Sequence, residues 1–153
     1  MARGTCYGIS RVKENALSFE PSDIYDLAGD EFDYVGEENL DDDIRGLMKW
    51  LEDKGTDVQL NFEDGEAIFS IKISDDVKRN CFRSQYEEFK KKAAAVTLDD
   101  FALRDPYQLR NLVEDVFSDA VYSYEMGFLT LDRWIREAEC GKTYYLAKAY
   151  LIH

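Results

Sequence analysis

The alternation of hydrophobic and polar positions predicts a β-hairpin in the middle of the chain. Over residues 57–63, apolar side chains alternate with polar ones, which is the period of a strand with one buried face. The dipeptide Asp64-Gly65 follows, and it favours a two-residue hairpin turn. Ile and Phe residues then continue to residue 73. We therefore predict a hairpin over residues 57–73.

A helical period appears just before this hairpin. Four apolar residues spaced i, i+3, i+4, i+7 predict a helix that begins near Asp43 and ends at Gly55, with Asp41 or Asp42 as its cap. The same spacing, with capping residues such as Ser74 and Thr97, predicts further helices along the chain. These cover residues 22–28, 75–95, 98–103 and 130–139, and a stretch that starts at Pro106, has its apolar positions through Val121 and is broken by Gly127.

The two ends of the chain supply the remaining strand candidates, at residues 3–12 and 143–152. The fold class expected from this pattern is α+β, with a small antiparallel sheet packed against several amphipathic helices. The sheet would consist of the hairpin 57–73 and the N- and C-terminal strands. Residues 29–40 are turn-like and are expected to form a flexible loop. A length of 153 residues fits a single globular domain over residues 1–153.

Composition narrows the class of protein. Apolar residues make up 45% of the chain and charged residues 33%, which is too apolar for a disordered chain and too charged for a membrane protein. No apolar run approaches the roughly 20 residues that a membrane-spanning helix needs. The first residues, from Met1 to Tyr7, lack the apolar core of a secretion signal. The expected compartment is the cytoplasm.

The negative charge is concentrated in one part of the sequence. The net charge is −13, and residues 20–64 hold 16 acidic and three basic residues, so they carry the whole excess. Glu14 to Ile44 contains 12 acids and no base. Such a segment produces a negative electrostatic potential on one side of the molecule, which attracts basic surfaces and repels phosphates. We expect no direct binding to nucleic acid or to a membrane.

Motifs for catalysis or cofactors are missing from the sequence. Cys6, Cys81 and Cys140 form no C-x-x-C pair, and in a reducing compartment we expect buried free thiols. The only histidine is His153, at the last position, which disfavours Cys-His and Ser-His catalysis. Gly141-Lys142-Thr143 resembles the end of a phosphate-binding loop but lacks its upstream glycine. We predict no catalytic, cofactor-binding or metal-binding residues and no cofactor.

Two alternative functions remain open, and one of them depends on the many carboxylates. A calcium loop that starts at Asp41 would place Arg45 at its fifth position, so that pattern fails. Thirty-two acidic residues bring some carboxylate pairs together in any fold, so a carboxylate- or divalent-metal-dependent hydrolase remains an alternative function. A small scaffold or assembly subunit is the other alternative.

The function that the charge pattern favours is non-enzymatic binding of a basic protein surface. A sharper version is DNA mimicry, in which carboxylates imitate phosphates and inhibit a nucleic-acid-binding protein. In size and charge the chain looks like small acidic inhibitors from phages and mobile elements, of the anti-restriction and anti-CRISPR kinds, which share composition and not a motif. Trp50 is added as an exposed aromatic anchor. The predicted partner-binding residues are Asp30, Glu31, Asp33, Glu37, Glu38, Asp41, Asp42, Asp43 and Trp50.

Overall fold

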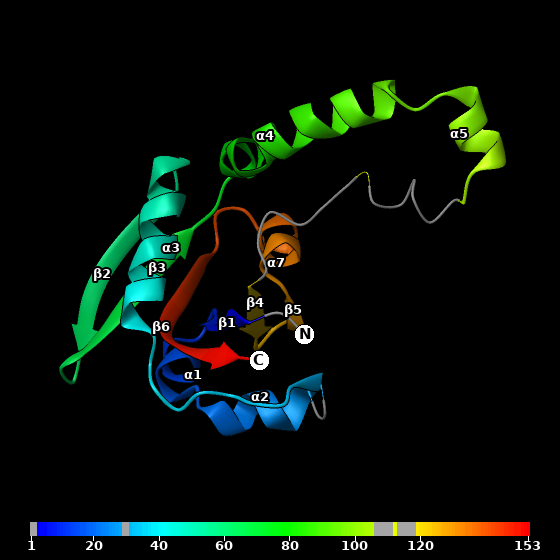
Figure 1. Cartoon of the computed structure of the whole chain (residues 1–153). Coiled ribbons are helices and arrows are strands. Elements are labelled where there is room, and N and C mark those ends of the chain that lie inside the picture. The colour runs from blue at the N-terminus through cyan, green and yellow to red at the C-terminus, as the bar shows by residue number, and fades with distance from the viewer. Residues whose placement is uncertain (1–2, 29–30, 106–111, 113–118) are drawn as a thin grey trace.

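One twisted sheet with helices on both faces forms the body of the protein (Figure 1). The computed structural model describes residues 3–28, 31–105, 112 and 119–153. Within these ranges the strands are β1 (Gly4–Ser10), β2 (Asp57–Glu63), β3 (Glu66–Lys72), β4 (Ala120–Ser123), β5 (Gly127–Thr130) and β6 (Thr143–Ile152). The helices are α1 (Lys13–Ser18), α2 (Pro21–Ala28), α3 (Asp41–Asp53), α4 (Asp75–Ala94), α5 (Leu98–Leu103) and α7 (Leu131–Glu137). The strand order across the sheet is β2-β3-β6-β1-β4-β5.

The sheet is mixed, which corrects the prediction of a small antiparallel sheet. The α+β class and the two terminal strands are confirmed, but β1 pairs in parallel with β4. The error came from Ala120 and Val121, whose apolar spacing continued that of the preceding residues and was assigned to a helix. In the structure both residues lie in β4, which forms a second hairpin with β5. Residues 106–111 and 113–118 of that predicted helix lie outside the described residues.

The central hairpin forms as predicted. β2 and β3 pair in continuous register from Asp57 opposite Lys72 to Glu63 opposite Glu66. Asp64 and Gly65 both adopt positive φ values, 50° and 82°. Two successive residues with positive φ make a type I′ turn, whose twist matches that of the strands.

The helix expected from Asp43 begins earlier, at Asp41. Its N-cap is Leu40, which has no side-chain acceptor, so the prediction that Asp41 or Asp42 caps this helix is wrong. The three aspartates lie instead in the first turn, where the helix dipole favours negative charge. Gly55 takes the left-handed conformation expected after the helix end, with φ 97°.

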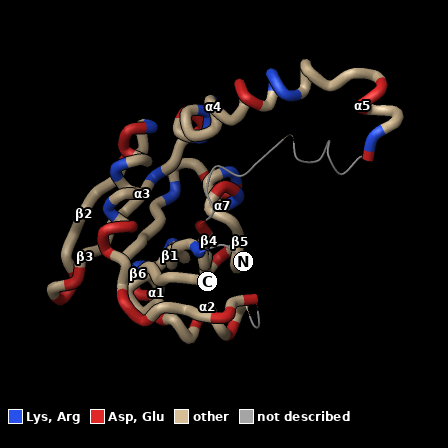
Figure 2. Tube along the Cα trace, in the orientation of Figure 1, with Lys and Arg blue, Asp and Glu red and all other residues tan. Residues whose placement is uncertain are grey.

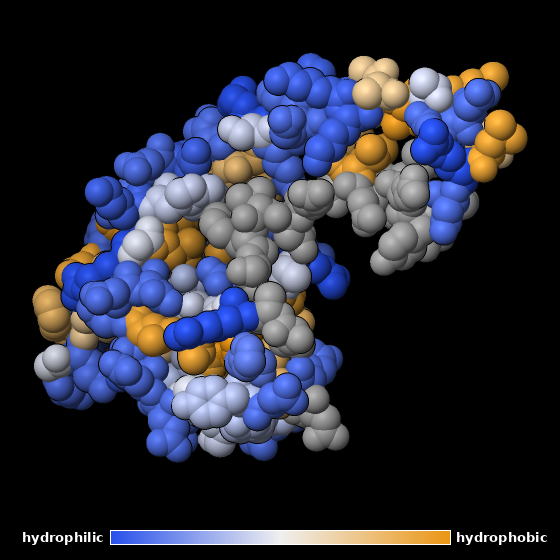
Figure 3. Space-filling view, in the orientation of Figure 1, coloured by the Kyte–Doolittle hydropathy of each residue, from blue (hydrophilic) through white to orange (hydrophobic). Residues whose placement is uncertain are grey.

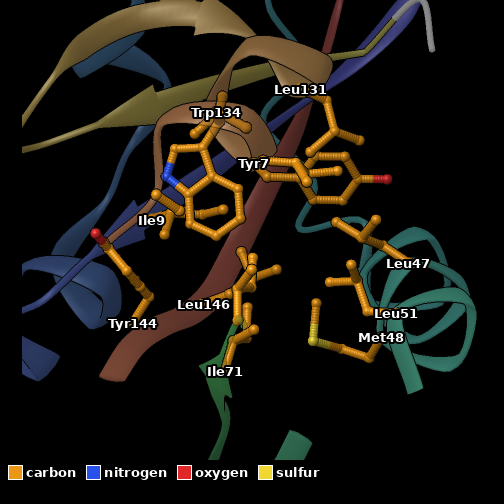
Figure 4. Close-up of a cluster of buried hydrophobic side chains, with 14 of the residues drawn as sticks. Tyr7, Ile9, Leu47, Met48, Leu51, Ile71, Leu131, Trp134, Tyr144 and Leu146 are labelled. Carbon is orange, nitrogen blue, oxygen red and sulfur yellow. The ribbon is translucent and has the colours of Figure 1, made fainter. Parts of the chain in front are cut away.

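The main core lies between one face of the sheet and the helices α3, α7 and the start of α4 (Figure 4). Tyr7 and Ile9 of β1 point to this face, whereas Cys6 points to the other. Leu47, Met48 and Leu51 supply the α3 side, as their helical spacing predicts (Figure 4). Trp134 of α7 is 1% exposed and packs edge-on against Tyr144.

A second core covers the opposite face of the sheet, under α1 and α2. Its centre is Phe19, whose ring lies 5.2 Å from that of Tyr122 and 5.3 Å from that of Tyr150, centroid to centroid. Tyr150 also donates a hydrogen bond to the Phe19 carbonyl, 2.9 Å long. Sequence periodicity missed α1, a six-residue helix without a side-chain cap. The body therefore has three layers, with β1 and β6 at the centre.

Helix α4 leaves the body and extends away from it, with α5 at its far end (Figure 1). Val77 and Cys81 are buried against the main core, whereas Tyr86 and Phe89 are exposed. Apolar side chains gather over α5, where Leu98, Phe101 and Leu103 are also exposed (Figure 3). Both caps predicted here are present, at Ser74 and in the capping box of Thr97 with Asp100.

Replacing Ser74 tests how much the N-cap of α4 contributes to the stability of the fold. The Ser74 hydroxyl accepts a hydrogen bond from the Val77 N–H, 3.2 Å long. Ser74→Ala is expected to lower the free energy of unfolding by about 1 kcal/mol, measured by urea denaturation. Ser84→Ala, at an exposed position of the same helix, removes a hydroxyl without a capping role and should leave stability unchanged or slightly higher. Equal losses in both variants would contradict the capping role.

Candidate functional site

A pocket of about 510 Å³ opens at one end of the sheet, where β1 and β4 begin and β6 ends. Five segments meet there: the start of β1, the segment 34–40, the first turn of α3, the residue before β4 and the end of β6. Its lining includes the carboxylates of Glu37, Glu38, Asp43 and Asp119 together with Arg3. The pocket therefore combines a defined hollow with a concentration of acidic side chains.

The segment 33–40 is held along β6 by main-chain hydrogen bonds. Gly36 N–H donates to the Leu151 carbonyl at 2.8 Å, and Leu40 N–H donates to the Ala149 carbonyl at 2.9 Å. The Asn39 amide accepts from the Ala149 N–H and donates to the Ala147 carbonyl, at 3.0 and 3.4 Å. Residues 33–40 form the loop expected from sequence, tied to β6 by these bonds and by a β-bridge between Val35 and Ile152. Glu37 and Glu38 therefore project from a fixed backbone.

Thr5 connects two carboxylates of the pocket, Asp43 and Asp119. Its hydroxyl donates to Asp43 Oδ2 at 2.6 Å, and its N–H donates to Asp119 Oδ1 at 2.9 Å. The Tyr7 hydroxyl, from the next position but one on β1, donates to the Asp43 main-chain carbonyl at 3.5 Å. Asp43 and Asp119 are consequently held near each other by groups of one central strand.

Burial and a neighbouring charge shift the pKa of Asp119. Burial raises the pKa of Asp119, and the Asp43 charge raises it further, while the Thr5 N–H and the Tyr7 hydroxyl act in the opposite direction. Burial, with the charges of Asp119 and Asp43, also raises the pKa of Tyr7, which stays neutral at physiological pH. A nearby cation would therefore stabilise the ionised form of Asp119.

The pocket carboxylates lack a bound counter-charge in the described part of the chain. Glu37, Glu38, Asp43 and Asp119 take part in none of the ion pairs formed there. Asp41, in the same first turn of α3 as Asp43, differs because Arg45 Nε lies 2.7 Å from its carboxylate. Figure 2 shows acidic residues continuing from α2 through this region. The pocket thus groups four carboxylates that form no ion pair in the described part of the chain, with Arg3 as the basic residue of its lining.

The structure brings together some of the sequence-predicted residues and separates others. Glu37, Glu38 and Asp43 line the pocket, whereas Glu31, Asp33 and Asp42 are exposed outside its lining. Trp50 is half-buried against the main core, with Lys54 Nζ 5.3 Å from its ring centroid, so it is not the exposed anchor that was expected. Asp30 lies outside the described residues.

Sequence reasoning missed Thr5 and Asp119. Thr5 lies in β1 and Asp119 lies directly before β4. Only the parallel pairing of these two strands places the two residues together. The available signal was weak: Asp119 is a single acid that precedes the apolar pair Ala120-Val121, which had been assigned to a helix. Arg3, Tyr34 and Leu151 complete the hollow from segments far apart in the sequence.

The described residues contain no group of three or more His, Cys, Asp or Glu side chains placed to hold a metal ion. Among these residues, no helix is long and apolar enough to cross a membrane. The cysteines are free, as predicted, and Cys6 and Cys81 are buried, with pKa values that burial raises to about 12 and about 11. Cys140 is exposed, which corrects the prediction that all three are buried.

The raised pKa of Asp119 predicts a pH-dependent stability difference. The folded state holds a proton on Asp119 more tightly than the unfolded state does, so ionising this group costs stability as the pH rises through its folded pKa. Asp119→Asn keeps an acceptor for the Thr5 N–H and removes that cost. We expect the variant to melt a few degrees higher than the parent at about pH 7, with the difference shrinking towards about pH 4. Asp33→Asn, at an exposed site, should show no such pH-dependent gain.

Comparison of the chain with protein family models, with curated proteins and with solved structures finds no match in any of the three.

Proposed function

We propose that this protein is a non-enzymatic binding protein whose acidic pocket anchors a basic surface of another protein. The observation that carries the proposal is the grouping of Glu37, Glu38, Asp43 and Asp119 around one hollow without an ion-pair partner among the described residues. A lysine or arginine side chain of a partner fits this chemistry, since it would supply the missing counter-charge.

The fixed backbone of the pocket supports this proposal. Segment 33–40 is hydrogen-bonded to β6, and Thr5 orients Asp43 and Asp119 before any partner arrives. Preorganised groups lose less conformational entropy on binding than mobile ones. The acidic residues outside the pocket then speed the encounter through long-range attraction, which weakens as salt is added.

The sharper version of the proposal is a DNA mimic that inhibits a nucleic-acid-binding protein. The acidic surface extends beyond the pocket to α2 and to the segment that contains Glu31 and Asp33 (Figure 2). A nucleic-acid channel presents several lysines and arginines in a row, so it would engage both the pocket and these flanking acids. A competition assay separates the two versions: a mimic displaces duplex DNA from a basic DNA-binding protein, whereas a binder of other basic surfaces leaves that complex intact.

The binding proposal is tested with a nona-arginine peptide as the probe, followed by fluorescence anisotropy. The triple variant Glu37→Gln/Glu38→Gln/Asp43→Asn removes three pocket charges. At physiological salt we expect it to bind at least about tenfold more weakly than the parent, because each lost pair contributes up to about 1 kcal/mol.

The matched control removes the same charge elsewhere. Glu87→Gln/Glu88→Gln/Asp99→Asn neutralises three exposed acids on α4 and α5, none of which lines the pocket. We expect its affinity for the peptide to stay within about twofold of the parent. Equal losses in the two triple variants would show that only net charge matters, and this would overturn the assignment of the pocket as the anchor.

The second candidate is a carboxylate-dependent hydrolase, and the observation that favours it is the raised pKa of Asp119 beside Asp43. A carboxyl group whose pKa is raised by burial and by a neighbouring carboxylate is a candidate general acid. Calorimetric titration with magnesium, manganese and calcium tests the metal-dependent form. A stoichiometric site of micromolar affinity that is lost in Asp119→Asn would favour the hydrolase, whereas weak and diffuse binding would count against it.

A further inference from the structure

Strand β2 has a free edge at the end of the sheet. It pairs with β3 on one side, and nothing in the described residues pairs with its other side (Figure 1). Two of its apolar side chains are exposed, Leu60 by 39% and Phe62 by 66%. No residue of β2 lines the acidic pocket, so this edge is a separate surface.

The turn between β2 and β3 fixes which main-chain groups point outward. A two-residue type I′ turn closes on a hydrogen-bonded pair, here Glu63 and Glu66. Because hydrogen-bonded and non-hydrogen-bonded pairs alternate along an antiparallel ladder, the N–H and C=O groups of Val58, Leu60 and Phe62 point to the free edge. Their side chains share one face of the sheet. Residues 58–62 therefore present both unpaired main-chain N–H and C=O groups and apolar side chains at the free edge.

The features that normally protect an edge strand are missing from β2. Its sequence, Asp-Val-Gln-Leu-Asn-Phe-Glu, contains no proline, lysine or glycine, and its register with β3 runs without a shift. Natural edge strands usually carry an inward charge, a proline or a bulge that blocks pairing with another chain. A regular seven-residue edge with exposed Leu and Phe is therefore a template for strand addition.

We propose that the free edge of β2 pairs antiparallel with β2 of a second copy of this chain, about a twofold axis through Leu60. The order of residue types along β2 is the same in both directions: acid, apolar, amide, apolar, amide, apolar, acid. The twofold register therefore sets Leu60 opposite Leu60, Val58 opposite Phe62 and Gln59 opposite Asn61. The two sheets become one continuous sheet whose α3 faces lie on the same side.

In this register, the outward main-chain groups form hydrogen bonds and the facing side chains match in polarity. The pairs centred on Val58, Leu60 and Phe62 are those with outward N–H and C=O groups, so each exchanges two hydrogen bonds across the axis. Apolar cross-strand pairs stabilise such a ladder, and the Gln59 and Asn61 amides can donate to and accept from each other. A shift by one residue would place apolar side chains opposite amides.

The ends of the strand explain why a second copy fits better than a basic peptide. Asp57 lies opposite Glu63 of the second copy, and two carboxylates without ion-pair partners would repel each other. Glu63 is already paired with Lys13, whose Nζ lies 2.9 Å from the carboxylate, so each Asp57 meets an ion pair. That pairing also leaves less uncompensated charge for an extended Lys- or Arg-rich peptide to neutralise.

Disulfide trapping tests the register directly, in a Cys140→Ser background that removes the exposed native thiol. Opposed residues of a hydrogen-bonded antiparallel pair have Cα atoms about 5.5 Å apart, within the range of about 4.4–6.8 Å for a disulfide. Leu60→Cys is expected to form a covalent dimer under mild oxidation. Gln59→Cys alone should not, because it lies diagonal to its own copy at about 7–8 Å. Mixing Gln59→Cys protein with Asn61→Cys protein should restore cross-linking.

Analytical ultracentrifugation tests the association without a covalent trap. We expect the parent to shift from monomer to dimer between about 1 and 100 µM, the affinity range of a small interface. Leu60→Lys sets two lysines against each other at the axis and should remain monomeric. Leu98→Lys, the same change at an exposed position on α5, should dimerise like the parent. A parent that stays monomeric at about 100 µM, or equal cross-linking of Leu60→Cys and Gln59→Cys, would overturn the proposal.

Discussion

Gly8→Ala is expected to lower the free energy of unfolding by about 3 kcal/mol, through a clash inside the second core. A Cβ at this position would lie 2.2 Å from Cδ2 and 2.5 Å from Cγ of Phe19. The Phe19 ring is 1% exposed and is fixed between Tyr122 and Tyr150, so it cannot swing away. Gly8 itself pairs with Tyr122 of β4, and the register of β1 with β6 shifts between Tyr7 and Ile9, so its backbone is held on the β4 side.

Urea denaturation of three variants measures this effect. Gly46→Ala is the control, because a Cβ there meets nothing within 4 Å, and in a helix it should raise stability by about 0.5–1 kcal/mol. The double variant Gly8→Ala/Phe19→Leu should lose less than the sum of its single changes, since the smaller side chain relieves the clash. Additive losses, or a Gly8→Ala protein as stable as the parent, would contradict the close contact between β1 and Phe19.

Trp134→Ala should cost about 3–5 kcal/mol, the loss typical of a large aromatic side chain removed from a packed core. The indole fills the space between α7 and the sheet beside Ile9 and Tyr144 (Figure 4). Its truncation leaves a cavity that the two surrounding elements cannot close, because β1 and β6 are fixed at the centre of the sheet.

Trp134→Phe separates the packing of this residue from its polar group. The buried indole N–H has no hydrogen-bond partner among the described residues, so removing it costs no bond there. Phe keeps the aromatic contact with Tyr144, and we expect a loss of about 1.5 kcal/mol or less. Thermal melts followed by circular dichroism compare the two variants. A Phe variant as unstable as the Ala variant would mean that the N–H has an essential partner.

Local signals in the sequence predicted the elements whose patterns are complete within a few residues. The hairpin over 57–73, the long helix from Ser74 and the capping box at Thr97 each combine a period with a specific turn or cap. Where such signals conflicted, the prediction failed. Ala120 and Val121 have helical spacing to the preceding residues, but their place in β4 is decided by pairing with Cys6 and Tyr7 of β1.

The candidate site could be predicted only in part, for a related reason. Glu37, Glu38 and Asp43 belong to the acidic segment, and their charge alone marked them. The other half of the site, Thr5 and Asp119, depends on a parallel strand pair between residues more than a hundred positions apart. Charge density also marked Asp41, but Arg45 neutralises it on the surface of α3. The sequence alone predicts that this surface is negatively charged, whereas the shape of the pocket depends on the pairing of β1 with β4.

Two surfaces of this small body have different proposed roles. The pocket at the beginning of β1 offers uncompensated carboxylates, and the free edge of β2 offers main-chain groups with apolar side chains. A twofold dimer through β2 would present two copies of the pocket to a partner. Such a dimer would raise the apparent affinity for a repeated basic surface through effective concentration, provided that the spacing of the two pockets matches that surface.

The central claim, that the acidic pocket is the anchor for a basic partner, is tested most directly by NMR titration of the ¹⁵N-labelled protein with the nona-arginine peptide. The account predicts that the largest amide shifts at physiological salt cluster at Thr5, Gly36, Glu37, Glu38 and Asp43, with smaller shifts at acids outside the pocket. Shifts spread evenly over the acidic residues of α2, α3 and the hairpin turn, with no maximum at the pocket, would contradict it.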